Sequence, residues 1–248
     1  TLAAVALGSW WWTDTSTPRT FFQTAVGEHA NIELPDGSVL QLNSNSLARV
    51  DYEHRRRLIR LDRGEAFFKV AHDPDRPFWV VAGNSWVRAV GTAFNIYVRP
   101  GDVRVTVSEG IVKVMAAAQS DRSAPSDTEP AAGAASVLTA GQQVDVSRRT
   151  IDVRSLQPVE LERSLAWRSG MVYFENEPLG EVVSELERYT TLQIVITDDA
   201  LRDLLVGGTF QSDAQGADAL LTMLQDGFGL QIRRDAHTAY IDRALDPP

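Results

Sequence analysis

One pair of residues in this sequence could perform chemistry, Gly91-Thr92 in the stretch RAVGTAFNIYV over residues 88–98. A threonine hydroxyl can attack the carbonyl of the preceding residue and shift the acyl group from nitrogen to oxygen, if the peptide bond is strained and the hydroxyl is aimed at it. Glycine allows that close approach. Gly-Thr pairs are common in β-proteins, so the residues alone favour a packing role over self-cleavage.

The strand around this pair is predicted from alternation. Val90, Thr92, Phe94, Ile96 and Val98 fall on one face of a strand over residues 90–98, with Gly91 in its interior. A glycine there marks a bulge, a sharp bend or a close backbone approach.

Other catalytic and metal-binding patterns are missing from the sequence. There is no cysteine, which removes disulfides, thiolate nucleophiles and thiolate metal sites. The histidines, His29, His54, His72 and His237, are not spaced as metal ligands. No nucleophile elbow, Walker loop or H-E-x-x-H motif occurs. We therefore predict no metal and no cofactor, and no enzyme apart from single-turnover self-cleavage at Gly91-Thr92.

Charge limits the partners. The chain of 248 residues has a net charge of −9 and a pI of about 5.0, so its bulk charge repels phosphate and disfavours nucleic acid. The arginine-rich run EHRRRLIRLDR, residues 53–63, is expected to be a solvated hairpin tip.

Residues 20–146 read as a β-rich domain. Short alternating runs are separated by turn signals about every ten residues, as in NIELPDGSVLQL over residues 31–42, which predicts an all-β sandwich or roll. Residues 116–136 are small and polar and contain proline, so we expect a flexible loop between two strands. A ligand-binding β-domain stays open as an alternative function, because it needs a concave pocket that sequence cannot show.

The pattern changes after residue 146. Residues 147–170 are predicted to be a connector, and residues 171–243 a small α+β domain in the order β-α-β-β-α-β-β, with two helices on one side of a sheet. Leu186 and Tyr189 share the apolar stripe of the first helix, which favours a core position.

The first residues are largely apolar and end in three tryptophans, Trp10 to Trp12. A membrane-spanning helix needs about 20 apolar residues, and tryptophan is typical of the membrane interface. We therefore expect residues 1–12 to be the end of a truncated transmembrane helix.

Several motifs together resemble a known family. VGEHANIELPDGSVLQLNSNS, RLIRLDRGEAFFKVAHDPDRPFWV, VRAVGTAFNIYV, VTVSEGIVKV and LTAGQQV are similar to the periplasmic domain of FecR-type anti-sigma factors. WRSGMVYFENEPLGEVVSELERYTTLQIVI and GGTFQSDAQGADALLTMLQDGFGLQI are similar to the C-terminal segment of that family, which resembles the short N-terminal (STN) domain of secretins and TonB-dependent receptors.

The resemblance implies a function and a location. It implies a single-pass inner-membrane protein of a Gram-negative bacterium, with this region in the periplasm. Its partners would be the signalling domain of an outer-membrane TonB-dependent siderophore receptor, periplasmic and intramembrane proteases, and an extracytoplasmic-function sigma factor bound through a cytoplasmic segment absent from this sequence. Some members also cleave themselves at a Gly-Thr that matches Gly91-Thr92.

We expect the partner to bind by strand addition to an exposed sheet edge of the STN-like domain, a common recognition mode. The candidate edges are LQIVIT, residues 192–197, and VGGTFQS, residues 206–212. The candidate binding residues are Leu192, Ile194, Ile196, Val206, Gly208 and Phe210.

Overall fold

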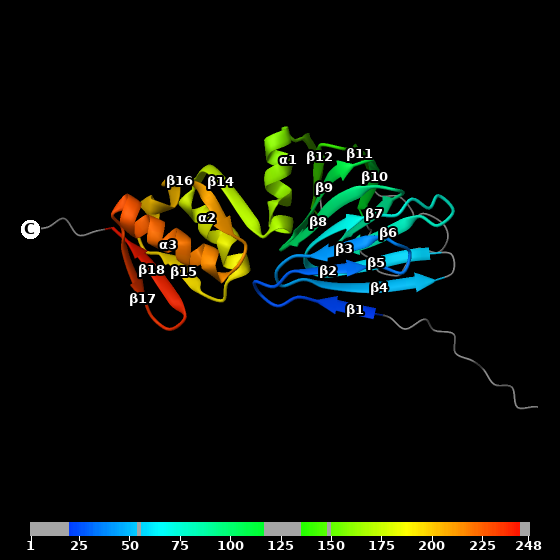
Figure 1. Cartoon of the computed structure of the whole chain (residues 1–248). Coiled ribbons are helices and arrows are strands. Elements are labelled where there is room, and N and C mark those ends of the chain that lie inside the picture. Colours follow the sequence, from blue (N-terminus) through cyan, green and yellow to red (C-terminus); the bar gives the residue numbers. More distant parts are fainter. Residues whose placement is uncertain (1–19, 54–55, 117–134, 148–149, 244–248) are drawn as a thin grey trace, which may run out of the picture.

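The computed structural model describes residues 20–53, 56–116, 135–147 and 150–243. They form a β-rich domain followed by a smaller domain that carries helices as well as strands (Figure 1). The predicted helix end at residues 1–12 lies outside the described residues, as does most of the predicted loop 116–136. Among the residues described, no helix is long and apolar enough to cross a membrane.

The β-rich domain is one folded sheet of 13 strands. The strands are β1 (Thr20–Gln23), β2 (Ala30–Glu33), β3 (Val39–Leu42), β4 (Leu47–Glu53), β5 (Arg56–Lys69), β6 (Phe78–Ala82), β7 (Ser85–Ala89), β8 (Ala93–Arg99), β9 (Asp102–Glu109), β10 (Ile111–Ala116), β11 (Ala135–Thr139), β12 (Gln142–Ser147) and β13 (Ile151–Ser155). Because β13 pairs with β12, this domain continues beyond residue 146.

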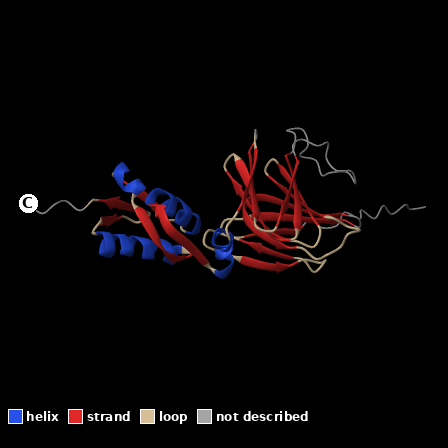
Figure 2. Ribbon diagram, turned by 90° about the horizontal axis from the view of Figure 1, so that it is seen from above, coloured by secondary structure: helices blue, strands red, loops and turns tan. Residues whose placement is uncertain are grey.

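The sheet folds into two layers because β5 belongs to both. The first part of β5 pairs with β4 and β6, in the layer β1-β4-β5-β6-β7-β10-β11. Its second part pairs with β3 and β8, in the layer β2-β3-β5-β8-β9-β12-β13. The predicted sandwich or roll is confirmed, and Figure 2 shows its strands beside the smaller domain of helices and strands. Apolar side chains of both layers fill the core, among them Leu40, Ile59, Phe68, Phe94, Val105 and Val112.

The chain passes from one layer to the other at glycines. Gly64 within β5, Gly91 between β7 and β8, and Gly110 between β9 and β10 have φ values of +82°, +63° and +79°. Glycine adopts this conformation without the steric cost of a side chain. The prediction of one strand through residues 90–98 is therefore wrong: β7 ends at Ala89, β8 begins at Ala93, and Gly91 marks the sharp bend between them.

A connector of α1 (Pro158–Leu165) and the 3₁₀ turn η1 (Ala166–Ser169) leads to the C-terminal domain. That domain consists of β14 (Met171–Pro178), α2 (Leu179–Leu186), η2 (Glu187–Tyr189), β15 (Gln193–Ile196), η3 (Asp199–Asp203), β16 (Leu205–Gln211), α3 (Ala214–Phe228), β17 (Gln231–Arg234) and β18 (Thr238–Asp242).

The predicted order of strands and helices in the C-terminal domain is confirmed, but the prediction of a single sheet is wrong. β14 pairs with β16, and a separate sheet has the order β15-β18-β17. Local alternation fixes the strands but not their partners. Leu186 and Tyr189 are buried in the core of this domain, as expected.

Replacing Gly64 by alanine should destabilise the β-rich domain more than replacing Gly37. Both have positive φ, but a Cβ at Gly64 would lie 2.6 Å from the Cα of Ser46, whereas Gly37 has open space around it. We expect Gly64→Ala to lower the free energy of unfolding by about 3 kcal/mol and Gly37→Ala by about 1 kcal/mol in urea titrations. Equal losses would contradict this account of the bend.

Candidate functional site

The Gly91-Thr92 bond lies at a bend of the β-rich domain, with a buried hydroxyl beside it. Thr92 is only 4% exposed, and its Oγ1 is buried without a hydrogen-bond partner among the described residues. The carbonyl oxygen of Thr92 accepts from the Val70 amide at 2.8 Å. A buried unpaired hydroxyl costs about 1–3 kcal/mol and asks for an explanation. No hydrogen bond within the described part of the chain engages this hydroxyl, which belongs to the residue directly after Gly91.

The Gly91-Thr92 bond has close neighbours on both sides, His72 and Gly110. A Cβ at Gly91 would lie 2.6 Å from Nδ1 of His72, and a Cβ at Gly110 would lie 2.8 Å from Cγ2 of Thr92 and 3.3 Å from the carbonyl oxygen of Gly91. Both glycines are therefore required by close approach as well as by backbone conformation. The sequence identified the Gly-Thr pair but not His72, which comes from a separate loop.

That loop is held by Arg57, which corrects the expectation of a solvated arginine run. The side chain of Arg57 is 1% exposed and forms an ion pair of 2.7 Å with the buried Asp36. It also donates to the carbonyl oxygens of Ala71 at 3.0 Å and Arg76 at 2.7 Å. The backbone on both sides of His72 is thereby fixed to β5.

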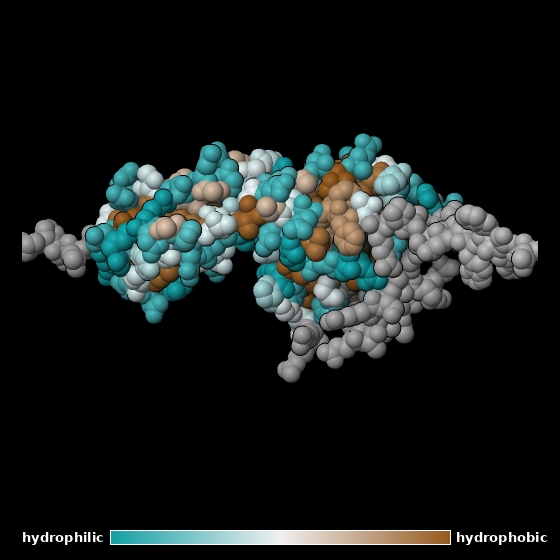
Figure 3. Space-filling view, turned by 90° about the horizontal axis from the view of Figure 1, so that it is seen from below, coloured by the Kyte–Doolittle hydropathy of each residue, from teal (hydrophilic) through white to brown (hydrophobic). Residues whose placement is uncertain are grey.

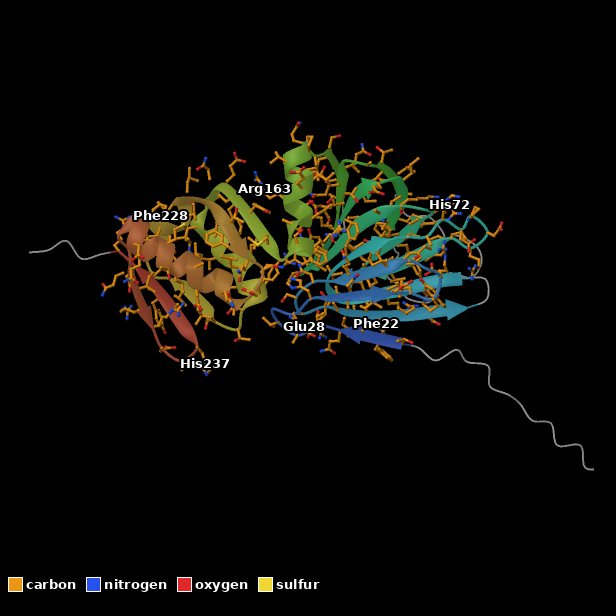
Figure 4. All side chains as sticks on the ribbon, viewed as in Figure 1. Phe22, Glu28, His72, Arg163, Phe228 and His237 are labelled. Carbon is orange, nitrogen blue, oxygen red and sulfur yellow. The ribbon has the colours of Figure 1, made fainter. Side chains whose placement is uncertain are left out.

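The histidines lie far apart where the structure describes them. His72 is at the end of the β-rich domain farthest from the C-terminal domain, and His237 is in that other domain (Figure 4). His29 is near the junction of the domains, and His54 lies outside the described residues. No group of three or more metal-ligating side chains occurs in the part of the chain that the structure describes.

The six residues predicted to bind a partner are buried or only partly exposed, and Gly208 among them has no side chain to offer. Four are in the core of the C-terminal domain, and Leu192 and Gly208 are half-buried; the four are Ile194, Ile196, Val206 and Phe210. The side chains in the core are therefore not free to contact a partner. What a partner can reach is the main chain at the edge of the sheet. On the face seen in Figure 3 the C-terminal domain is mostly hydrophilic, with hydrophobic residues in small groups.

The free edge of β15 is covered by one carboxylate. On the side of β18, the Gln193 amide donates to the carbonyl oxygen of His237, the residue before that strand, at 2.9 Å, and the Thr197 amide donates to the carbonyl oxygen of Ile241 at 3.1 Å. Because amides alternate in direction along a strand, that of Ile194 points to the other edge. There it donates to Oε1 of Glu187 at 2.8 Å. Glu187 therefore caps this edge against strand pairing, a known use of charged residues at edges.

A buried ionic junction joins the two domains. Glu65 of β5 is 4% exposed and forms an ion pair with Arg188 of η2, across a separation of 123 residues. The other donors to this carboxylate are the side-chain amides of Asn43 at 2.7 Å and Asn95 at 2.8 Å. A buried carboxylate is thus matched by one cation and two neutral donors, as its desolvation requires.

Further contacts of η2 extend this junction. The Asn43 amide donates to the Tyr189 hydroxyl at 3.1 Å, and the Ser44 hydroxyl donates to the carbonyl oxygen of Arg188 at 2.6 Å. The guanidinium of Arg188 lies 4.0 Å from the ring centroid of Tyr97.

The charge of Arg188 is held by its neighbours. Burial lowers the pKa of Arg188, but the carboxylates of Glu65 and Glu185 outweigh it and raise that pKa well above its ordinary value. Burial also raises the pKa of Glu185, which Arg188 opposes. The arginine therefore stays charged in the folded chain.

The connector covers the outer face of β3 and β5, the face of β5 on which Glu65 lies. The guanidinium of Arg168 lies 3.6 Å from the ring centroid of Phe67, and its Nε donates to Gln41 at 2.6 Å. Trp167 is buried in one cluster with Phe67 and Ala93. Phe67 points away from the core residues Ala66 and Phe68, and this aromatic residue on the outer face of β5 is the one local feature from which the cover could have been predicted.

Comparisons with known proteins agree across both domains. The family described as FecR protein matches residues 20–113, and the family described as FecR, C-terminal matches residues 171–241. Two crystal structures of a protein from Parabacteroides distasonis ATCC 8503 that is assigned as an anti-sigma factor are similar to this chain. Both have a TM-score of 0.69, with 25% and 24% identity, and they cover 92% and 91% of this chain and 100% of their own. The search of curated proteins finds no significant match.

Replacing Arg188 by methionine should leave Glu65 buried without its cation. Breaking a buried ion pair in this way costs about 3–5 kcal/mol, whereas an exposed pair contributes about 1 kcal/mol or less. We expect a loss of that larger size for Arg188→Met in urea unfolding, and partial recovery when Glu65→Gln is added.

The matched control is Arg49→Met. Arg49 pairs with Asp62 on the surface, where their side chains are 41% and 29% exposed. Equal losses for Arg49→Met and Arg188→Met would show that the junction adds nothing beyond a surface pair.

Proposed function

Because this chain belongs to the family of FecR-type anti-sigma factors, whose members are signalling regulators that act on a sigma factor, we propose that it is the sensing region of a transmembrane regulator. In this proposal the region lies in the periplasm of a Gram-negative bacterium, attached to the inner membrane. It binds the signalling domain of an outer-membrane TonB-dependent siderophore receptor. Periplasmic and intramembrane proteases then act, and a cytoplasmic segment relays the iron-uptake signal to an extracytoplasmic-function sigma factor.

The capped edge of β15 is the observation that carries this proposal. The C-terminal domain offers a main-chain edge for strand addition, because β15 is the end strand of its three-stranded sheet. A carbonyl oxygen of an added strand would accept the hydrogen bond of the Ile194 amide, which the Glu187 carboxylate now accepts.

Removing the cap should strengthen receptor binding. We expect Glu187→Ala in the full chain to lower the Kd for the purified receptor signalling domain about tenfold, because the incoming strand no longer competes with a charge-assisted hydrogen bond. Isothermal titration calorimetry measures this Kd. The control is Glu181→Ala on the exposed side of α2, which should leave the Kd unchanged. An unchanged Kd for Glu187→Ala would exclude the β15 edge as the binding site.

Self-cleavage at Gly91-Thr92 is a second candidate function, favoured by the buried unpaired Oγ1 of Thr92. In this proposal Oγ1 attacks the carbonyl carbon of Gly91, the C–N bond breaks as an ester C–O bond forms, and the hydroxyl proton passes to the released amine. Water then hydrolyses the ester, which restores the Thr92 hydroxyl and leaves a carboxylate on Gly91. The ring of His72 packs against Gly91 and supports the bent conformation that this attack needs.

Intact-mass measurements of freshly purified chain test this second function. The unchanged chain should divide into two fragments between Gly91 and Thr92, because the hydroxyl and the carbonyl belong to adjacent residues at a bend. Thr92→Ala should stay intact, and Thr92→Ser, which keeps the hydroxyl, should still cleave. A single full-length mass after long incubation of the unchanged chain would exclude it.

A further inference from the structure

Three consecutive residues form the turn η2, and together they contact two different parts of the molecule. Glu187 accepts from the Ile194 amide at the free edge of β15, Arg188 pairs with Glu65, and Tyr189 accepts from Asn43. The first contact belongs to the proposed partner-binding edge, and the other two belong to the domain junction.

The turn has little freedom to satisfy these contacts separately. It follows directly on α2, whose last residue, Leu186, is fully buried. The carbonyl oxygen of Arg188 accepts from Ser44, and a Cβ at Gly27 would lie 2.9 Å from the carbonyl oxygen of Tyr189. Backbone as well as side chains of η2 are therefore packed against the β-rich domain.

Strand addition at β15 would act directly on this turn. The carbonyl of an added strand needs the Ile194 amide, so the carboxylate of Glu187 must leave its place. A displaced Glu187 changes the backbone or side-chain geometry of the residue next to Arg188, and a buried ion pair depends strongly on its geometry.

We propose that η2 couples the two sites, so that opening the β15 edge loosens the Glu65–Arg188 junction and loosening the junction opens the edge. This inference rests on the proposed function for its biological meaning, since the receptor strand is the ligand that would open the edge. Coupling between two sites is reciprocal, so a change made at either one must appear at the other. Both directions are therefore measurable in the chain by itself, without a receptor.

Amide hydrogen exchange reports each site through one hydrogen bond. The Ile194 amide reports the edge through Glu187. The Gly27 amide donates to the Ser44 hydroxyl at 2.8 Å, and that hydroxyl donates to Arg188, so it reports the junction. The Gln193 amide, bonded to the carbonyl oxygen of His237 directly before β18, serves as an internal reference in the same strand.

The experiment compares Glu65→Gln and Glu187→Ala with the unchanged full chain by NMR hydrogen exchange. We expect Glu65→Gln to speed exchange at Ile194 at least about fivefold relative to Gln193, and Glu187→Ala to speed exchange at Gly27 by a similar factor. Tyr189→Phe, which removes the hydroxyl that accepts from Asn43 and donates to Glu185 at 3.4 Å, should act in the same direction as Glu65→Gln. The control Arg49→Met should change neither amide.

The coupling is overturned if Glu65→Gln speeds exchange at Gly27 and leaves Ile194 unchanged. It is also overturned if Ile194 and Gln193 speed up equally, because that indicates a general loss of stability. The proposed function is tested by a different measurement: it fails if calorimetry detects no association between the receptor signalling domain and the unchanged chain. Failure of the coupling and failure of the proposed function are therefore distinguishable.

Discussion

Glu65 follows the bend of β5 by one residue, and its buried carboxylate determines how the two domains are joined. A carboxylate removed from water must be matched by donors, and here Asn43 comes from the residue after β3, Asn95 from β8, and Arg188 from the other domain. Apolar contact alone would tolerate sliding of one domain over the other. A cation that must reach one carboxylate does not, so the Glu65–Arg188 pair, together with the contacts of Ser44 and Asn43 to η2, restricts how the C-terminal domain can sit on the β-rich domain.

Local patterns in the sequence predicted the elements better than their pairing. Alternation reports which side chains are buried, and it continues through Val90, Thr92 and Phe94 although the chain bends at Gly91 and enters the other layer. In the C-terminal domain, the order of the strands along the chain was predictable because each strand has its own alternation. Their division into two sheets was not. Pairing depends on contacts between distant segments, which have no local signature.

The candidate sites show the same limit. The Gly-Thr pair is adjacent in sequence and could be found there, but His72 reaches it only because Arg57 holds a separate loop. Glu65 and Arg188 are each unremarkable in their own segments, and only the fold brings them together. Glu187 is similar: the edge strand was predicted, but the carboxylate that caps it lies in the preceding turn.

The interleaving of strands has a consequence for the fate of a chain cut between Gly91 and Thr92. The first piece would keep β1 to β7 and the second β8 onward, yet β5 pairs with β8, and β7 pairs with β10. Glu65 would remain on one piece and Arg188 on the other. The product would be a tightly associated heterodimer, without a covalent bond between its subunits. Hydrolysis would release nothing until a force peeled whole strands from both layers, so such a cut would prepare the molecule for mechanical separation.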